Sequence, residues 1–422
     1  MSPPVPAAPG VYIDEIGGMP RTIAGVETSA CAFAGRAPGG PLAAVAGPVR
    51  VSSLAGFVDR FGPLDPACPM GEAVRDFFEQ GGRHALILRL RHGVATGDDG
   101  ADDAGPALAD ADYIGGDGRD GALSMLRDAE GFDLLCIPPD GPGADTSPAV
   151  YRAALALCVE CRAMLLVDGP AHWDDLPALL DDPAAAVDAL GLGGEAARNA
   201  ALYYPRLLPP GAAAGTPARV ASGAVAGVIA RTDAAHGVWK APAGREAGLA
   251  GVGALSVQVG DVAGGVLNQV AINCLRAFPG MGPVVWGART MGGGDTMGDE
   301  FKYVPVRRLA LYLERSVSRG IAWAVFEPND ASLWARLRQA VGDFMLALFR
   351  QGAFQGTTPR DGYFVKCDAT TVTAQDRAAG VCNIIVGFAP LKPGEFVVLA
   401  FAQATLPEPG GTESAQAARS PP

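Results

Sequence analysis

The sequence predicts a multidomain fold of mixed α+β and α/β class, with a central α/β domain, a C-terminal α+β domain and an extended, strand-forming arm at each end. Three observations predict it. Between residues 133 and 170, apolar strand-like runs alternate with a helical segment. Beyond residue 270, paired strand-like runs precede two long amphipathic segments. Short alternating or apolar runs also lie close to both termini, and 422 residues suffice for two or three domains.

The N-terminal arm comprises a Pro/Ala-rich leader followed by GVYIDEI. Val11 and Ile13 point to one side of the predicted strand, and Tyr12 points to the other. A lone strand is unstable, so it must pair with its own body or join the sheet edge of another subunit. The same two alternatives apply to the C-terminal run EFVVLAFAQ, with Phe396, Val397, Val398, Leu399 and Phe401.

Residues 23–95 predict strands in ACAFAG, VRV and HALILRL, and an amphipathic helix in MGEAVRDFFEQGG. From Asp98 to Asp120 the chain contains eight Asp and a single Arg among Gly and Ala. Their spacing lacks the fixed pattern of a calcium loop, so we expect a solvated acidic loop.

The middle of the chain predicts a β-α-β unit: a strand in DLLCIPP, a helix that begins at Ser147-Pro148 and a strand in MLLVDGP. The strand NAALYYP and the helix SGAVAGVIART follow. Asp140 and Asp168 stand at or beyond the carboxyl ends of strands, where α/β enzymes place chemistry. An α/β hydrolase-like or nucleotide-binding enzyme is therefore the alternative interpretation, although the chain has no glycine-rich phosphate-binding motif.

Asp168, His172 and Ser222 occur in the chain order of subtilisin-type proteases. However, Asp168 and His172 are four residues apart in one loop, so the imidazole is not placed to lie between the carboxylate and the hydroxyl. Ser222 has the ordinary alternative role of a helix N-cap. We therefore expect no catalytic residues.

Cys158 and Cys161 form a C-x-x-C pair late in a helical segment, which allows a redox or zinc interpretation. No second ligand pair follows at zinc spacing, so we favour buried thiols and expect no metal and no cofactor. The net charge of −12 disfavours binding to nucleic acid, and no apolar run is long enough to insert into a membrane. The N-terminal sequence lacks the pattern of a secretory signal, which favours a cytoplasmic protein.

In the C-terminal third, VPVRRLALYLERSVSRG and SLWARLRQAVGDFMLALFRQGAF carry apolar stripes at helical spacing. Pro305 suits a first helical turn, and Gly320 and Gly352 suit left-handed caps. Between Lys302 and Arg350 there are eight basic and four acidic residues, a local excess of positive charge on an acidic chain. This basic face is either a solvated surface or a docking face for an acidic partner.

LNQVAINCLRAFPGMGPVVWGART, YVPVRRLALYLERSVSRGIAWAVFEPND, LWARLRQAVGDFMLALFRQGAFQG and GFAPLKPGEFVVL resemble, in this order, the C-terminal domain of contractile tail sheath proteins. PGVYIDEI and GVIARTDAAHGVWKAPAG fit the same family, so the resemblance spans nearly the whole chain. The family is found in contractile-tailed phages and related injection systems, and its central domain is described as subtilisin-like by fold.

The resemblance implies an arm with a donated strand at residues 1–22, a core part at 23–95, the central α/β domain at 96–250, the C-terminal sheath domain at 251–406 and a disordered tail at 407–422. It implies a homo-oligomer of stacked sixfold rings around an inner tail tube protein, with a baseplate and tail-terminator or cap proteins as further partners. Assembly would take place in the bacterial cytoplasm, and contraction would drive the tube through a target envelope. Five arginines of the basic face are the candidates for tube contact: Arg307, Arg308, Arg315, Arg336 and Arg338.

Overall fold

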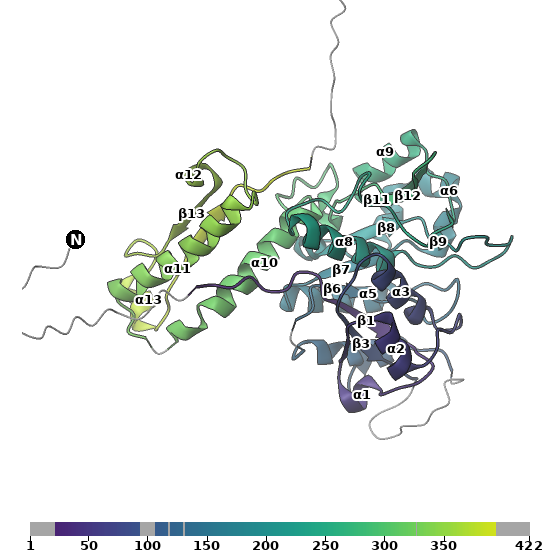
Figure 1. The fold of residues 1–422 in the computed structure, drawn as a ribbon, viewed down its shortest axis with the longest axis horizontal. Coiled ribbons are helices and arrows are strands. Elements are labelled where there is room, and N and C mark those ends of the chain that lie inside the picture. Colours follow the sequence, from purple (N-terminus) through teal and green to yellow (C-terminus); the bar gives the residue numbers. More distant parts are fainter. Residues whose placement is uncertain (1–21, 93–105, 117–118, 130, 326, 394–422) are drawn as a thin grey trace, which may run out of the picture. The chain divides into compact units, whose positions relative to one another are not determined.

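The computed structural model describes residues 22–92, 106–116, 119–129, 131–325 and 327–393. Its largest feature is an eight-stranded sheet in the order β12-β11-β8-β7-β6-β1-β3-β2 (Figure 1). The six inner strands are parallel, and an antiparallel strand lies at each edge. The strands are β1 (Cys31–Gly35), β2 (Val49–Val51), β3 (Ala85–Arg89), β6 (Leu134–Cys136), β7 (Met164–Asp168), β8 (Ala200–Tyr204), β11 (Ile272–Phe278) and β12 (Gly282–Val285).

The inner strands are apolar on both faces because the sheet is covered on both sides. In β1, Ala32 and Ala34 belong to one apolar cluster, and Cys31 and Phe33 belong to the other. Every residue of β1, β3, β7 and β8 is buried. The mixed α/β class with a mainly parallel sheet is therefore confirmed.

One helix on each face shows how the sequence builds these layers. Helix α5 (Pro148–Glu160) begins where predicted, with the Ser147 hydroxyl accepting a hydrogen bond from the amide of Val150. It connects β6 to the neighbouring parallel strand β7, which confirms the predicted β-α-β unit. On the opposite face, α3 (Pro69–Glu79) packs against α8 (Ser222–His236). A Cβ at Gly223 would lie 2.2 Å from the Ala73 carbonyl oxygen, so this close contact between the two helices requires glycine.

The C-terminal helices form a separate apolar cluster. Helix α10 (Val304–Gly320) and helix α11 (Ala331–Arg350) pack with a two-stranded antiparallel sheet of β13 (Tyr363–Lys366) and β14 (Ile385–Phe388). Leu309 and Leu313 of α10 meet Val341 and Met345 of α11 in this cluster. Both predicted stripes are thus core-packing faces.

The large sheet contains strands from three of the ranges predicted from the sequence. Strands from 23–95, from 96–250 and from the range predicted to begin at 251 all pair within the one large sheet. The hairpin β11–β12 forms as expected, but β11 pairs with β8 in parallel instead of belonging to the C-terminal α+β unit. Ile272 and Leu275 of β11 lie in different clusters, as expected of a strand buried on both faces.

The remaining elements connect or extend these layers, and all described elements belong to the unit of the chain that ends at Lys392. The short helices are α1 (Ala43–Ala46), α2 (Leu54–Phe61), α4 (Asp110–Ile114), α6 (Leu176–Asp181), α7 (Pro183–Asp188), α9 (Asp261–Gln269), α12 (Pro359–Gly362) and α13 (Ala374–Ala378). Two small sheets pair β9 (Leu207–Leu208) with β10 (Ala254–Leu255) and β4 (Gly115–Gly116) with β5 (Arg119–Asp120). None of the helices in the described residues could span a lipid bilayer as an apolar segment.

Candidate functional site

Residues 22–30, here called the strap, run along α10 without forming a helix or strand. Ile23 is buried in the apolar cluster of Leu309 and Leu313. A Cβ at Gly320, at the end of α10, would lie 2.7 Å from the Ile23 side chain. The helix ends with Ile321 as its C-cap and Gly320 is not in the left-handed region, so the predicted left-handed cap at Gly320 is wrong. Gly320 instead lets Ile23 approach the helix closely.

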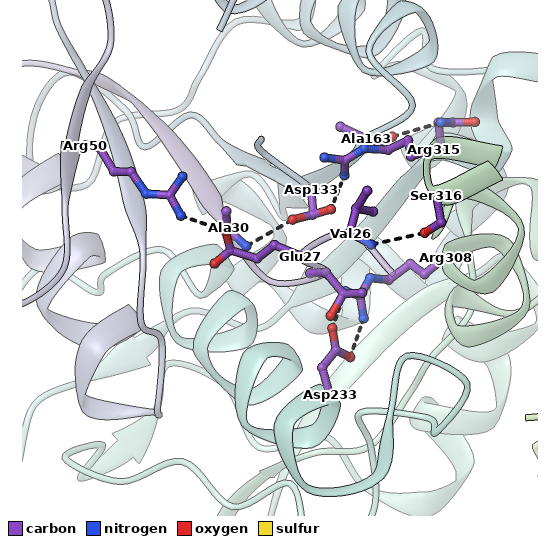
Figure 2. Close-up of polar contacts among 12 residues, drawn as sticks. Val26, Glu27, Ala30, Arg50, Asp133, Ala163, Asp233, Arg308, Arg315 and Ser316 are labelled. Carbon is purple, nitrogen blue, oxygen red and sulfur yellow. Dashed lines mark hydrogen bonds and ion pairs between the residues drawn. The ribbon is translucent and has the colours of Figure 1, made fainter. Parts of the chain in front are cut away.

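Polar contacts to the main chain fix the rest of the strap. The amide of Val26 donates to the Ser316 hydroxyl at 3.1 Å, and the amide of Ala30 donates to Asp133 Oδ2 at 3.1 Å. Between them, the Arg308 guanidinium donates to the carbonyl oxygen of Thr28. Figure 2 shows these groups converging on one short stretch of chain. Between Val26 and Ala30, the strap is therefore held by main-chain atoms on every second residue.

We call the side chains that hold the strap the clasp: Asp133, Asp233, Arg308, Arg315 and Ser316. Two ion pairs organise it (Figure 2). Arg308 and Asp233 share two hydrogen bonds of 2.8 and 2.6 Å, and each side chain is 4% exposed. Arg315 donates to Asp133 Oδ1, which leaves Oδ2 of the same carboxylate for the strap. The clasp thus ties α10, α8 and the start of β6 to one segment.

The clasp has an unusual titratable group. Burial raises the pKa of Asp133 to about 7, although Arg315, Arg308 and the Ala30 amide each favour the carboxylate and oppose the shift. A carboxylic acid with this pKa changes charge near neutral pH. The site can therefore bind a chain segment with a strength that depends on pH. None of its groups is arranged as a nucleophile with a base.

The five arginines predicted to contact a tube have different environments. On α10, Arg307 donates to Asn199 Oδ1, and Arg308 and Arg315 belong to the clasp. Arg308 is buried, so its guanidinium is not available to a partner and we leave it out of the proposal below. On α11, Arg336 is half exposed beside Glu327, and Arg338 is exposed while donating to the carbonyl oxygen of Cys367.

The strand residues predicted at the termini lie outside the described residues. These are Val11, Tyr12, Ile13, Phe396, Val397, Val398, Leu399 and Phe401. The described chain nevertheless contains a sheet that such strands could join. Within the described residues β13 and β14 pair only with each other, and Phe364 and Ile385 are 49% and 48% exposed.

Within the described residues, Asp168, His172 and Ser222 do not form a catalytic triad. Asp168 Oδ1 accepts hydrogen bonds of 2.8 Å from the amides of Ala221 and Ser222, so the carboxylate caps the start of α8. His172 is exposed and has a ring contact with Trp173, and no hydrogen bond of the described residues joins it to Asp168 or Ser222. Asp140 is held by Arg36 through contacts of 3.0 and 2.8 Å. These carboxylates stabilise loops and helix ends.

The C-x-x-C pair also has a structural environment. Cys158 is fully buried in the sheet core, and Cys161 is partly buried with its thiol 3.9 Å from the carbonyl oxygen of Leu126. Burial raises the pKa of both thiols, which disfavours the reactive thiolate. In the described part of the chain, no group of three or more His, Cys, Asp or Glu is placed to hold a metal ion.

Sequence reasoning did not find the strap, Asp133 or Asp233. One signal was available, because Asp133 is a charged residue at the head of the fully apolar run DLLCIPP and needs a partner when buried. The strap offers no such signal. Its hydrogen bonds to the clasp use main-chain atoms, which every sequence supplies.

Comparison with known proteins gives three kinds of match. Residues 296–403 match the family model of the phage tail sheath C-terminal domain. A tail sheath protein of Vibrio phage KVP40 is 28% identical over 183 residues. That match covers 43% of this chain, and the chain spans about a quarter of that curated relative, 26% of its length.

Solved structures extend the likeness to nearly the whole chain. The sheath complex of the extracellular contractile injection system PVC, in its contracted state, aligns with a TM-score of 0.71 and 26% identity over 95% of this chain and 98% of that one. The contracted helical sheath of the anti-feeding prophage aligns with a TM-score of 0.69 and 26% identity over 94% of this chain and all of that one, 100%. Residues 296–403 thus match the phage tail sheath C-terminal domain, and nearly the whole chain is similar in fold and sequence to sheath subunits of contractile injection systems.

Proposed function

We propose that this chain is the structural subunit of a contractile sheath, which polymerises as stacked sixfold rings around an inner tube and shortens to drive the tube through a target envelope. The carrying observation is the alignment over 95% of the chain with a sheath subunit in its contracted state. The parallel sheet, which we infer keeps a subtilisin-like topology, would serve as a rigid body. The sheath would be assembled in the bacterial cytoplasm and attached to a baseplate and to terminator or cap proteins.

The terminal arms are the proposed links between subunits. Residues 11–13 and the run from Phe396 to Phe401 would each add a strand to the β13–β14 sheet of a neighbour. The half-exposed side chains of Phe364 and Ile385 support this sheet as the acceptor. A two-stranded sheet is marginal alone, so added strands would complete it.

The strap and the clasp would attach the C-terminal end of the N-terminal arm to a fixed point on its own subunit. Ile23 is anchored on α10, and nine residues separate it from Ile13. An extended chain covers at most about 3.3–3.6 Å per residue, so Ile13, at the end of the donated strand, must lie within roughly 35 Å of Ile23. The proposal therefore limits the distance between a subunit's strap and its neighbour's acceptor sheet. Tension on the arm would pass to α10 and then to the sheet through the clasp.

The tube-facing surface is proposed to include α11. The three candidate arginines of α10 are at least partly buried against the body of the same subunit, whereas Arg336 and Arg338 of α11 are exposed although each has a partner. Basic groups on a chain of net charge −12 would favour an acidic partner. This assignment chooses between two helices that the sequence does not distinguish.

Electron microscopy of the purified protein, alone and mixed with its tube protein, tests the proposal. We expect striated tubular particles whose yield increases with protein concentration. A monodisperse monomer at every concentration, with or without tube protein, would contradict it. Labelling of such a monomer at Ser222 by a fluorophosphonate would favour the enzyme alternative.

A further inference from the structure

Two cysteines flank one end of the β13–β14 sheet. The strands pair as far as Lys366 and Ile385; Cys367 follows the first directly, and Cys382 precedes the second. The two Sγ atoms are 3.7 Å apart, although 15 positions separate the residues in the sequence. A disulfide bond is about 2.05 Å long, so small side-chain rotations would bring the sulfurs to bonding distance.

The main chain around both cysteines is anchored to the same support. Arg338 of α11 donates to the carbonyl oxygen of Cys367 at 2.9 Å. The Asn329 side chain donates to the carbonyl oxygen of Val381, next to Cys382, also at 2.9 Å. Trp334 of α11 in turn donates to Asn329 Oδ1 at 2.7 Å. The proximity of the thiols is therefore fixed by α11 and its N-terminal loop, not by the cysteines themselves.

The two thiols differ in access to solvent. Cys367 is fully buried with Leu333, Trp334 and Leu337, and Cys382 lies partly exposed at the rim of this cluster. Burial, followed by hydrogen bonding with Cys382, raises the pKa of Cys367 to about 12. A dissolved oxidant would thus meet Cys382 first.

A second pair shows that proximity alone is not sufficient. Cys31 and Cys136 have Sγ atoms 3.6 Å apart on neighbouring strands of the large sheet. Both are completely buried, so no oxidant reaches either thiol without opening the core. Among the pairs within the described chain, Cys367 and Cys382 combine proximity with access.

We propose that Cys367 and Cys382 are a redox modification site, which a low-molecular-weight disulfide such as oxidised glutathione converts into an intrachain disulfide. The Cys382 thiolate attacks one glutathione sulfur, and the first glutathione leaves as a thiolate that takes up a proton. Cys367 then loses its proton to solvent and attacks Cys382 Sγ, and the second glutathione leaves in the same way. Two protein thiols are oxidised, and one glutathione disulfide is reduced to two thiols.

The bond would close the chain segment between the two cysteines and hold β13 and β14 together at that end. A cross-link stabilises a fold mainly by restricting the unfolded chain, so the marginal two-stranded sheet would gain most. Formation of the disulfide requires only this chain and the low-molecular-weight oxidant, and no other protein. Its effect on strand acceptance by the sheet, in contrast, rests on the sheath function proposed above.

Peptide mapping tests the site directly. Trypsin cleaves after Lys366 and after Arg377, so Cys367 and Cys382 fall on different peptides that only a disulfide can join. The folded full-length protein is incubated with oxidised glutathione, its remaining thiols are alkylated in denaturant, and it is digested without reduction. We expect the joined peptide pair, its loss on reduction, and alkylation of Cys31 and Cys136 as free thiols.

Two variants complete the test. Cys382→Ser should lose the joined peptides, whereas Cys161→Ser, at another partly buried thiol, should keep them. Oxidation should raise the unfolding temperature of the wild type and of Cys161→Ser, but not of Cys382→Ser. The proposal is overturned if both thiols stay open to alkylation, if Cys382 stops at the glutathione adduct, or if the peptides join only after oxidation in denaturant.

Discussion

Arg308 of α10 and Asp233 of α8 share two hydrogen bonds in a site where each side chain is only 4% exposed. Replacing Arg308 with Met leaves the Asp233 carboxylate buried without this partner, so we expect the free energy of unfolding to fall by about 3–5 kcal/mol. Denaturant titration of both proteins measures this loss in the free energy of unfolding. Arg336→Met, which breaks a half-exposed pair with Glu327, serves as the control and should cost under about 1 kcal/mol.

The double variant Arg308→Met/Asp233→Leu removes both charges and should recover much of this loss, because a buried pair is often replaceable by apolar side chains. If the losses of the two single variants simply add, the pair does not act as a unit and our description of the clasp is wrong.

Asp133 should make stability depend on pH. Its pKa is about 7 in the folded chain and about 3.9 in an unfolded one. Between these values the folded state binds more protons, so its stabilising contribution is complete below about pH 4 and is lost as the pH rises through 7. The loss approaches about 1.4 kcal/mol per pH unit within that range.

The side chain in Asp133→Asn cannot titrate, so this variant lacks the pH-dependent contribution of Asp133 to the free energy of unfolding. The difference in unfolding free energy between wild type and Asp133→Asn, measured from pH 4 to pH 8, should move against the wild type as the pH rises. Parallel profiles would show that Asp133 keeps an ordinary pKa.

Gly320 and Gly342 form a matched pair of helical glycines. A Cβ at Gly320 would lie 2.7 Å from Ile23, whereas nothing lies within 4 Å of one at Gly342. Gly320→Ala should therefore destabilise the chain by about 1–3 kcal/mol, and Gly342→Ala should stabilise it by about 0.5–1 kcal/mol.

Hydrogen exchange locates the effect of Gly320→Ala. The amides of Val26 and Ala30, which are hydrogen-bonded in the strap, should exchange faster in this variant and normally in Gly342→Ala. Adding Ile23→Ala should relieve the clash. Unchanged exchange in Gly320→Ala would mean that the strap does not depend on this close approach.

Deleting residues 1–13 tests the proposed strand donation. The deletion removes Val11, Tyr12 and Ile13 but not the strap, so the protein should fold with an unchanged unfolding temperature and fail to form tubes. Removing residues 410–422, a segment of equal length, is the control and should leave tube formation intact. Normal tubes from the first variant would exclude the N-terminal arm as a necessary link.

Charge reversal on α11 tests the proposed tube surface. Arg336→Glu with Arg338→Glu should weaken association with the tube protein, and the remaining affinity should depend less on salt than that of the wild type. Arg127→Glu is a suitable control because Arg127 forms a similar exposed pair with Glu160, on the sheet domain. Equal binding by all three proteins would leave α11 as a solvated face.

Local sequence patterns predicted most elements but not their long-range pairing. Periodicity gave the helices α3, α5, α8, α10 and α11, and the apolar runs gave the inner strands. The run VAINCLRAF predicted a strand without indicating that β11 would pair with β8, some 70 residues earlier. Strand neighbours depend on burial across the whole sheet, which a local pattern does not show.

The candidate site was likewise predictable from the sequence only in part. The basic excess on α10 and α11 was visible in the sequence, but charge counting could not separate Arg308, which is buried, from Arg336, which is exposed. That distinction depends on Asp233, a residue 75 positions away in the chain.

The clasp holds the strap through hydrogen bonds to the amides of Val26 and Ala30 and the carbonyl oxygen of Thr28. The side chains of these three residues take no part in these hydrogen bonds. The partly exposed positions of Val26 and Thr28 can therefore vary during evolution without losing these contacts, whereas Ala30 is fully buried in the sheet core. Drift should be tolerated at Val26 and Thr28 but not at Gly25, where a methyl group would collide with the Tyr312 hydroxyl. An alignment of relatives would then show an invariant glycine directly before variable positions, a pattern easily mistaken for an unimportant linker.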